Sequence, residues 1–324
     1  MPAPTERPAS LPVLAELWRG GIRESVHHGA WVEVDSAGRV LSAVGDPEYV
    51  TTMRSAAKPI QALPLLSLPG FQELEIRSEE LAICCASHAG EPRHCGLAAS
   101  VLSLSGYLPD NLVCGPAGHP PSPLKHGCSG NHAAILLIAH LLGATLEGYH
   151  RPGHPAQTII HTKLQEMSRT KSIVDAQDAC GIPTFGLTLS AIATSFARLA
   201  QAGPIPEAMM AHPELIGPSE HFDTQIMRAF PGRIVAKTGA EGLLCLGLFG
   251  QDKGMAVKIG DGNPRSLGVV TLAAMRQAGW ITDEEYLHEE LSSMRCPLYY
   301  SSTGEAAAEL RLRRDSFTFG IGDM

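Results

Sequence analysis

Apolar and polar residues near the start of the chain alternate in a way that is typical of β-strands. Within residues 24–34 the apolar positions of one face are Val26, Ala30, Val32 and Val34. A turn with the sequence Asp-Ser-Ala-Gly follows at residues 35–38, and residues 39–44 return as a second strand. This pattern predicts a β-hairpin, because alternation places every second side chain on the same face of a strand.

The middle of the chain, from residue 78 to about residue 220, has the spacing of apolar positions that is typical of helices. Segments rich in Gly and Pro interrupt this pattern at residues 115–121, 152–155 and 203–206 and predict joints between helices. A further helix is predicted to begin after Ser55. The helices predicted in the middle of the chain cover residues 81–87, 95–104, 131–142, 155–168 and 189–202.

After residue 233 the pattern changes. Three short apolar segments, at residues 234–237, 243–249 and 255–259, predict strands, and residues 264–278 predict a helix. The most economical assembly is an α/β (α+β) fold with one antiparallel five-stranded sheet. The last helix and the helix after Ser55 would cover the sheet. The middle helices would form an inserted lobe, with a ligand cleft between the lobe and the sheet.

These elements predict a single domain over residues 1–315. Its sheet lobe would comprise about residues 20–75 and 230–291, and its helical lobe would comprise about residues 76–229. Residues 316–324 show no packing pattern, so we expect a disordered tail there.

Composition and charge exclude several classes of protein. Of the 324 residues, 44% are hydrophobic and 18% are charged, which excludes a disordered chain. The net charge is −8 and no five like charges follow one another, which argues against nucleic acid as a partner. The longest apolar run, residues 133–142, is shorter than the roughly 20 residues that span a bilayer. We therefore expect a cytoplasmic protein without membrane contact, with its eight cysteines reduced.

The sharpest local motif is Ser-x-x-Lys at Ser55 and Lys58. This spacing places both side chains one turn apart on a helix. There a desolvated, neutral lysine can take the serine proton while the serine attacks a carbonyl. The alternative is a helix cap followed by a solvated lysine. The Lys-Thr-Gly at residues 237–239 favours catalysis, because the two motifs occur together in serine acyl-enzymes.

Four other residues stand at the ends of predicted elements. Lys237, followed by Thr238, and Lys258 each end a strand, where a lysine can bind a substrate carboxylate or simply be solvated. Ser87 and His88 follow a buried apolar segment, where they either face a cleft or cap a helix.

Cys128 and Cys180 each lie in a loop next to a glycine. Two thiolates are too few for a structural zinc site, which needs four ligands. His126, His132 and Asp178 are the candidates for further ligands. The alternative interpretation is that both thiols belong to the core or to loops.

Six segments follow one another in order between about residues 20 and 291: RSAAKP, ICCASHAGEPRH, KHGCSGNHAA, DACGIPTF, AKTGAEG and VKIGDGNPR. Together they resemble the motifs of the thermolabile L-asparaginase II family, the class 3 or Rhizobium etli-type asparaginases. The resemblance implies a serine β-lactamase-like fold, shared with penicillin-binding proteins. It also implies a cytoplasmic homodimer that hydrolyses L-asparagine to L-aspartate and ammonia through a seryl acyl-enzyme.

The resemblance also implies roles for individual residues. The family has two Ser–Lys pairs at its active site, which on this chain are Ser55 with Lys58 and Ser87 with Lys258. The residues that match family contacts to the substrate are Arg54, His132 and Asp178. Further substrate-binding candidates are His88, Asn131, Lys237 and Thr238.

The family binds zinc through the Cys and Lys of a CSGKH segment and the Cys of a D-x-C-G segment. Cys128 and Cys180 match the two cysteines, whereas Asn131 stands where the lysine is expected. An amide is a poorer ligand than an amine, so the resemblance predicts weak zinc binding. The serine–lysine chemistry predicts that zinc is not essential to the reaction.

Three alternative functions stay open at this point. One is a related serine amidohydrolase, such as a glutaminase or a β-lactam-type enzyme. Another is a hydrolase in which zinc activates water. The last is a non-catalytic homologue that binds an amino acid, which the change at Asn131 keeps open.

Overall fold

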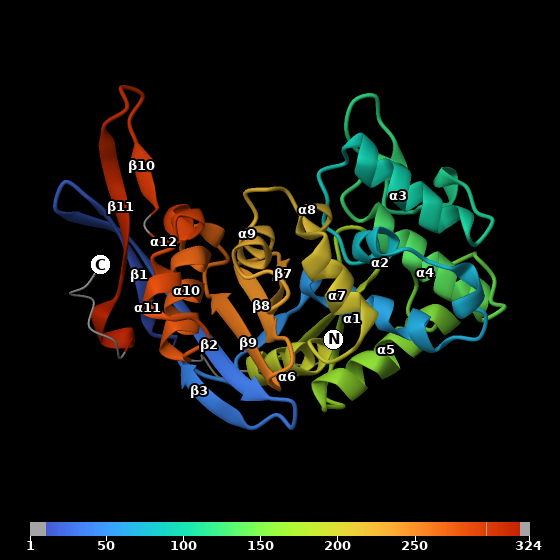
Figure 1. Cartoon of the computed structure of the whole chain (residues 1–324), viewed down its shortest axis with the longest axis horizontal. Coiled ribbons are helices and arrows are strands. Elements are labelled where there is room, and N and C mark those ends of the chain that lie inside the picture. The colour runs from blue at the N-terminus through green and yellow to red at the C-terminus, as the bar shows by residue number, and fades with distance from the viewer. Residues whose placement is uncertain (1–10, 296, 318–324) are drawn as a thin grey trace.

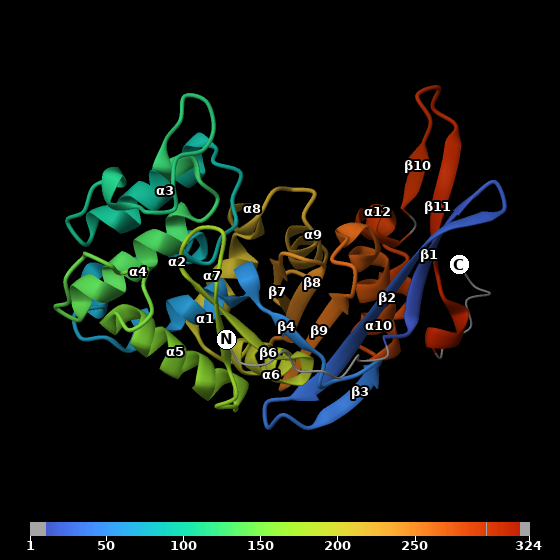
Figure 2. The same ribbon diagram turned by 180° about the vertical axis from the view of Figure 1, so that it is seen from behind.

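The computed structural model describes residues 11–295 and 297–317, and its largest element is one curled antiparallel sheet. The strands follow the order β10-β11-β1-β2-β9-β8-β7, and β3 pairs with β2. Their bounds are β1 Val13–Arg19, β2 Ile22–Asp35, β3 Val40–Val44, β7 Ile234–Gly239, β8 Leu243–Leu248, β9 Lys253–Ile259, β10 Leu298–Tyr300 and β11 Ala306–Leu312. The β10–β11 hairpin projects at one end of the molecule, and the helical lobe lies at the other (Figures 1 and 2).

All five predicted strands belong to this sheet, as β2, β3, β7, β8 and β9. The predicted number of strands was wrong, because β1, β10 and β11 extend the sheet beyond β2. In the register of β1 with β11, Leu17 lies opposite Leu310. Local periodicity cannot reveal that β1 pairs with a strand so far along the chain. In addition, β1 is a nearly continuous apolar run, so it lacks the alternation that predicts a strand.

Helices cover both faces of the sheet and build the lobe beside it (Figures 1 and 2). Their bounds are α1 Lys58–Ala62, α2 Ser78–Cys84, α3 Pro92–Ser103, α4 Ser129–Leu141, α5 Pro155–Ser168, α6 Leu189–Leu199, α7 Pro204–Ala211, α8 Pro213–Ile216, α9 Phe222–Ala229, α10 Leu267–Gln277, α11 Asp283–Tyr286 and α12 Ser292–Arg295. A 3₁₀ turn, η1, precedes α1 at Arg54–Ala57. Every helix predicted from the sequence is present. No helix in the described part of the chain is long and apolar enough to cross a membrane.

Two predictions for the middle of the chain were wrong. The predicted joint at residues 203–206 is the start of α7, because Gly203 at φ +76° ends the preceding turn and Pro204 fits the first helical position. The lobe also contains a small sheet, in the order β4-β6-β5. Its strands are β4 Val50–Thr52, β5 Val174–Gln177 and β6 Pro183–Thr188. Neither β5 nor β6 alternates, since β5 is exposed throughout and β6 is almost entirely buried.

The start of the predicted disordered tail is packed. Ser316 Oγ donates to the carbonyl of Val13 at 2.6 Å, and Phe317 is only 6% exposed. The rest of the predicted tail, residues 318–324, lies outside the described residues.

Helix α6 lies directly on the sheet where two glycines pair across neighbouring strands. Gly247 of β8 and Gly254 of β9 are opposite one another. A Cβ atom at Gly254 would overlap the backbone of Ala193 and Ala197 in α6, and one at Gly247 would overlap the carbonyl of Phe196. Because neither glycine has a side chain, α6 can pack directly against the backbone of β8 and β9. Helix α10 covers the opposite face (Figures 1 and 2).

Gly254→Ala should lower the free energy of unfolding by about 1–3 kcal/mol, because α6 must move away from the sheet. The matched control is Gly96→Ala on α3, where an added Cβ meets nothing within 4 Å. This control should raise the free energy of unfolding by about 0.4–1 kcal/mol, since alanine restricts the unfolded chain. Urea unfolding measures both values, and equal stability of the two variants would contradict the described packing.

Candidate active site

The amine of Lys58 lies at the centre of a group of polar residues where three helices meet. Lys58 is 2% exposed. Its Nζ donates to the carbonyl of Ala86 at 2.6 Å, lies 3.0 Å from Ser87 Oγ and lies 3.3 Å from Cys128 Sγ. Ala86 and Ser87 follow α2, and Cys128 precedes α4. We call Lys58, Ser87 and Cys128 the Lys58 cluster.

Ser55 stands three residues before Lys58, within η1, and is half-buried. The structure gives the Ser55 hydroxyl no hydrogen-bond partner among the described residues. Lys58 Nζ lies 3.0 Å from Ser87 Oγ, and the pairing of Lys58 with Ser55, three residues earlier, stays a prediction.

Lys258 lies apart from this cluster. It is buried on β9, and its Nζ donates to the carbonyl of Ile259. Burial lowers the pKa of Lys258, and the nearby charges of Glu241 and Asp261 act in the opposite direction. No hydrogen bond joins Lys258 to Ser87 among the described residues, and their pairing at the active site stays a prediction.

Lys237 forms a fully buried ion pair with Asp223 on α9. Lys237 Nζ lies 3.0 Å from Asp223 Oδ2, and neither side chain is more than 1% exposed. The same carboxylate accepts the backbone N–H of Thr238 at 2.9 Å. Burial would raise the pKa of Asp223, but the charge of Lys237 and the two hydrogen bonds outweigh it and hold the pKa below its usual value. Burial lowers the pKa of Lys237, although Asp223 counteracts it.

This ion pair gives Lys237 a partner that the sequence did not show. Its predicted role in substrate binding stays a prediction. Its charge does act on Lys58, which lies close enough for the two to repel. The sequence offered no signal for Asp223, which is one acidic residue in an amphipathic helix.

Arg54 and Asp178 form an ion pair at the other side of Ser55. Arg54 Nε donates to Asp178 Oδ1 at 2.9 Å, and the Arg54 backbone N–H donates to Thr184 Oγ1 at 3.0 Å. Arg54 has a φ of +49°, which is unusual for a residue with a Cβ and is a form of strain found at functional sites. The predicted proximity of Arg54, Ser55 and Asp178 is present.

Cys128 and Cys180 are adjacent, as predicted, and both are free thiols. A hydrogen bond from Cys180, the charge of Lys58 and a hydrogen bond from His126 hold the pKa of Cys128 well below its usual value, against the effect of burial. The hydrogen bond to Cys128 and burial raise the pKa of Cys180. Hydrogen bonds to Cys114 and Cys128 raise the pKa of His126 to about 10. These surroundings favour ionisation of Cys128 over ionisation of Cys180.

His88 contacts Ser129, the first residue of α4. Its Nδ1 accepts the N–H of Gly90 at 3.1 Å, so its Nε2 donates to Ser129 Oγ at 2.9 Å. The hydroxyl of Ser129 donates in turn to the carbonyl of Leu124 at 2.9 Å. His88 thus fixes the loop that carries Cys128, and burial lowers its pKa to about 3.

Asn131 and His132 occupy the first turn of α4, and both are completely buried. Neither atom of the Asn131 amide has a partner in the described part of the chain, and the same holds for His132 Nε2. The other ring nitrogen of His132, Nδ1, lies 2.7 Å from the hydroxyl of Tyr149. Tyr149 is a residue that the sequence analysis did not identify.

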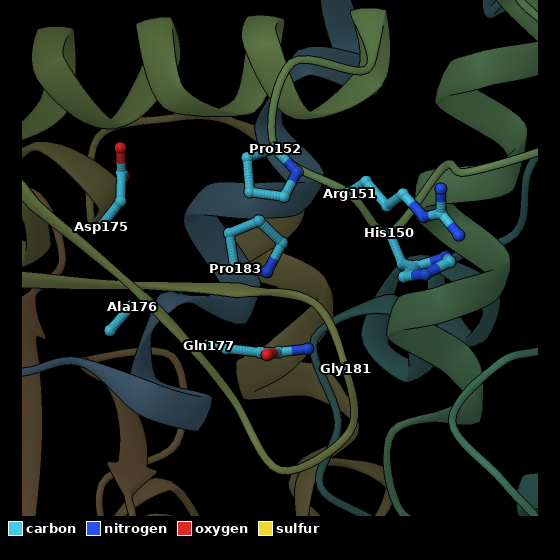
Figure 3. A pocket seen from close by; sticks show the side chains of 8 residues that line it. All are labelled: His150, Arg151, Pro152, Asp175, Ala176, Gln177, Gly181 and Pro183. Atoms are coloured by element: carbon cyan, nitrogen blue, oxygen red, sulfur yellow. The ribbon is translucent and has the colours of Figure 1, made fainter.

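A cavity of about 290 Å³ lies beside the loop that carries Cys180 (Figure 3). His150 and Arg151 lie on one side of it, and Asp175, Gln177 and Gly181 lie on the other. No residue of the Lys58 cluster lines this cavity.

Residues 15–312 match the L-asparaginase II family. The chain belongs to this family. Membership supports an asparaginase-type amidohydrolase with a small-molecule substrate, and it confirms the resemblance at the level of the family. No curated protein matches the chain.

Two solved structures resemble this L-asparaginase II family member weakly. A β-lactamase from Mycobacterium bovis shares 15% identity over 72% of this chain and 88% of its own, with a TM-score of 0.32. The structure of Mglu in its tris and glutamate form shares 14% identity over 78% of this chain and 60% of its own, with a TM-score of 0.29. These scores are too low to assign the β-lactamase-like fold, which stays a prediction.

The residues of this family member complete only part of the expected zinc site. Cys128 and Cys180 supply two adjacent sulfur ligands, which suit zinc. The third position holds Asn131, and amide oxygens suit harder ions such as magnesium and calcium. Within residues 11–295 and 297–317 no group of three His, Cys, Asp or Glu side chains is arranged to hold a metal ion. This donor set does not amount to a zinc site, so no catalytic step is assigned to zinc.

Asp223→Asn removes the counter-charge of Lys237 while keeping the size of the side chain. It should lower the free energy of unfolding at pH 7 by about 3–5 kcal/mol, because a buried ammonium is left without its partner. The folded-state pKa of Asp223 is lowered, so this contribution is present above the unfolded pKa of about 4 and is lost as the pH falls through the folded pKa. The difference from wild type should therefore shrink in acid.

Two controls accompany this measurement by urea unfolding. Asp283→Asn removes an exposed partner of Arg276 and should change stability little. Replacing both members of the buried pair, as Asp223→Leu with Lys237→Met, should restore most of the lost stability. A stable Asp223→Asn protein would show that Lys237 is not charged in the fold.

Proposed function

We propose that this chain is an L-asparaginase of the class 3, Rhizobium etli-type, which hydrolyses L-asparagine to L-aspartate and ammonia through a seryl acyl-enzyme. The observation that carries the proposal is the position of Lys58. It follows Ser55 by three residues, its Nζ lies 3.0 Å from Ser87 Oγ, and its side chain is buried. Membership of the L-asparaginase II family supports the amide substrate.

In the proposed reaction the Ser55 hydroxyl attacks the side-chain amide carbon of asparagine. Lys58 accepts the hydroxyl proton, and a β-aspartyl ester forms as the C–N bond breaks. Ser87, in contact with Lys58, passes a proton to the leaving nitrogen, which departs as ammonia. A water molecule then hydrolyses the ester, giving aspartate and free Ser55.

Lys58 must be neutral to accept a proton, because an ammonium nitrogen has no free lone pair. Its Nζ lies 3.3 Å from Cys128 Sγ and 2.6 Å from the carbonyl oxygen of Ala86.

Substrate recognition is assigned to Arg54. Asp178 accepts its Nε, which orients the guanidinium and leaves its two terminal nitrogens to hold the α-carboxylate of asparagine. We also propose that the protein is a cytoplasmic homodimer with a serine β-lactamase-like fold, as the family resemblance implies.

Ser55→Ala should lower kcat for ammonia release from asparagine by roughly 10⁴–10⁶-fold, because it removes the nucleophile. Ser87→Ala should cost less, since a relay contributes typically 10²–10⁴-fold. The matched control is Ser103→Ala on α3, whose hydroxyl donates to the carbonyl of Ser100 on the exposed surface. If Ser55→Ala kept near-wild-type turnover while Ser87→Ala lost it, Ser87 would be the nucleophile.

Zinc should bind weakly and activity should survive its removal, because Asn131 is a poor third ligand and the serine–lysine chemistry needs no Lewis acid. Asn131→Lys restores the expected family residue and should tighten binding. The measurement is a zinc titration of both proteins after exhaustive chelation. Equal affinities, or permanent loss of activity in the metal-free wild type, would contradict this prediction.

A further inference from the structure

Tyr149 is a buried residue to which neither the sequence motifs nor the proposed reaction gives a role. It is 1% exposed and lies in the loop that connects α4 to α5. Its hydroxyl has two neighbours within hydrogen-bond distance, the backbone N–H of Val113 at 3.0 Å and His132 Nδ1 at 2.7 Å. His132 is one of the residues that match substrate contacts in the family.

The donors and acceptors around the Tyr149 hydroxyl determine whether it donates to His132 Nδ1 or accepts from it. The N–H of Val113 can only donate, so it occupies one lone pair of the phenol oxygen. The phenolic proton then needs an acceptor, and His132 Nδ1 is the one that the described residues provide. Nδ1 therefore accepts, and the neutral imidazole carries its own proton on Nε2.

The surroundings of Tyr149 hold its ring in place. Gln157, which is 3% exposed, donates from Nε2 to the Tyr149 carbonyl at 2.9 Å. The edges of two histidine rings pack at about right angles against it, His132 and His150, each with centroids 5.7 Å away. His150 also lines the cavity in Figure 3. These contacts hold the Tyr149 ring so that its hydroxyl stays directed at His132 Nδ1.

The second ring nitrogen of His132 makes no hydrogen bond with the described residues. Nε2 is buried and has no partner in the described part of the chain. The backbone N–H of His132 donates to the carbonyl of Cys128 at 3.0 Å, and the Cys128 sulfur contacts Lys58. A ring with its proton on Nε2 offers a hydrogen-bond donor, whereas the other tautomer would offer a lone pair.

We propose that Tyr149 is a positioning residue that holds His132 in the Nε2–H tautomer, so that His132 serves the active site as a hydrogen-bond donor. The tautomer assignment follows from the contacts of Tyr149 alone. The use of the donor, for an oxygen of the bound amide substrate, rests on the proposed function.

Tyr149→Phe tests this by removing only the hydroxyl. In ¹⁵N-histidine-labelled wild type, NMR should show His132 with a protonated Nε2 and an unprotonated Nδ1, assigned by comparison with His132→Gln. In Tyr149→Phe a population with the proton on Nδ1 should appear. The kcat for asparagine should fall by about 10–100-fold, the range typical for residues that orient a site residue, with a smaller change in KM.

The matched control is Tyr107→Phe. Tyr107 meets His140, at the other end of α4, edge to face at 6.3 Å, without a hydroxyl–imidazole hydrogen bond. This variant should leave the tautomer of His132 and kcat unchanged.

The outcomes separate the two proposals. Protonation of Nδ1 in wild type overturns the role of Tyr149, and so does an unchanged Nε2–H tautomer in folded Tyr149→Phe. The wild-type spectrum gives this answer even if Tyr149→Phe does not fold. If the tautomer changes as expected but no protein releases ammonia from asparagine, the positioning of His132 stands and the proposed function falls. If the tautomer changes and wild type is active but Tyr149→Phe keeps full kcat, the donor role of His132 is overturned.

Discussion

A single amine buried from water determines how the segments around the site meet. Lys58 can be held in the interior only if its hydrogens find acceptors, since an unpaired buried charge costs several kcal/mol. The acceptors come from the end of α2 and the start of α4, so both ends must converge on α1. Gly130 permits that approach, because a Cβ atom there would overlap the carbonyl of Ile83 in α2.

The sequence allowed prediction of those parts of the site whose geometry is local. Ser55 and Lys58 are neighbours on one turn whatever the rest of the fold does, and the Gly-flanked Cys128 and Cys180 segments were identified as a pair by motif. The Asp223–Lys237 pair and the contact of Lys58 with Ser87 could not be predicted, because each depends on how distant elements pack. The pairing of Lys258 with Ser87 was expected from the family resemblance alone, and in the structure Lys258 Nζ donates to the carbonyl of Ile259.

The charged side chains around the site have partners, whereas several neutral ones do not. Asp178 forms an ion pair with Arg54, and Asp223 forms an ion pair with Lys237. By contrast, both amide atoms of Asn131 and one ring nitrogen of His132 are buried without partners in the described chain. Native proteins satisfy nearly all buried polar atoms, and exceptions tend to lie at functional sites. In the described part of the chain, three of these partnerless buried atoms thus lie together in the first turn of α4.

The pairing of β1 with β11 has a consequence for how the chain is made. Strand β1, at Val13–Arg19, is synthesised long before its partner on one side, β11, at Ala306–Leu312. Until β11 is made, β1 therefore presents an unpaired, largely apolar edge, of the kind that invites association with other chains. A chaperone that shields this edge would have to act on the β1–β2 hairpin until that point.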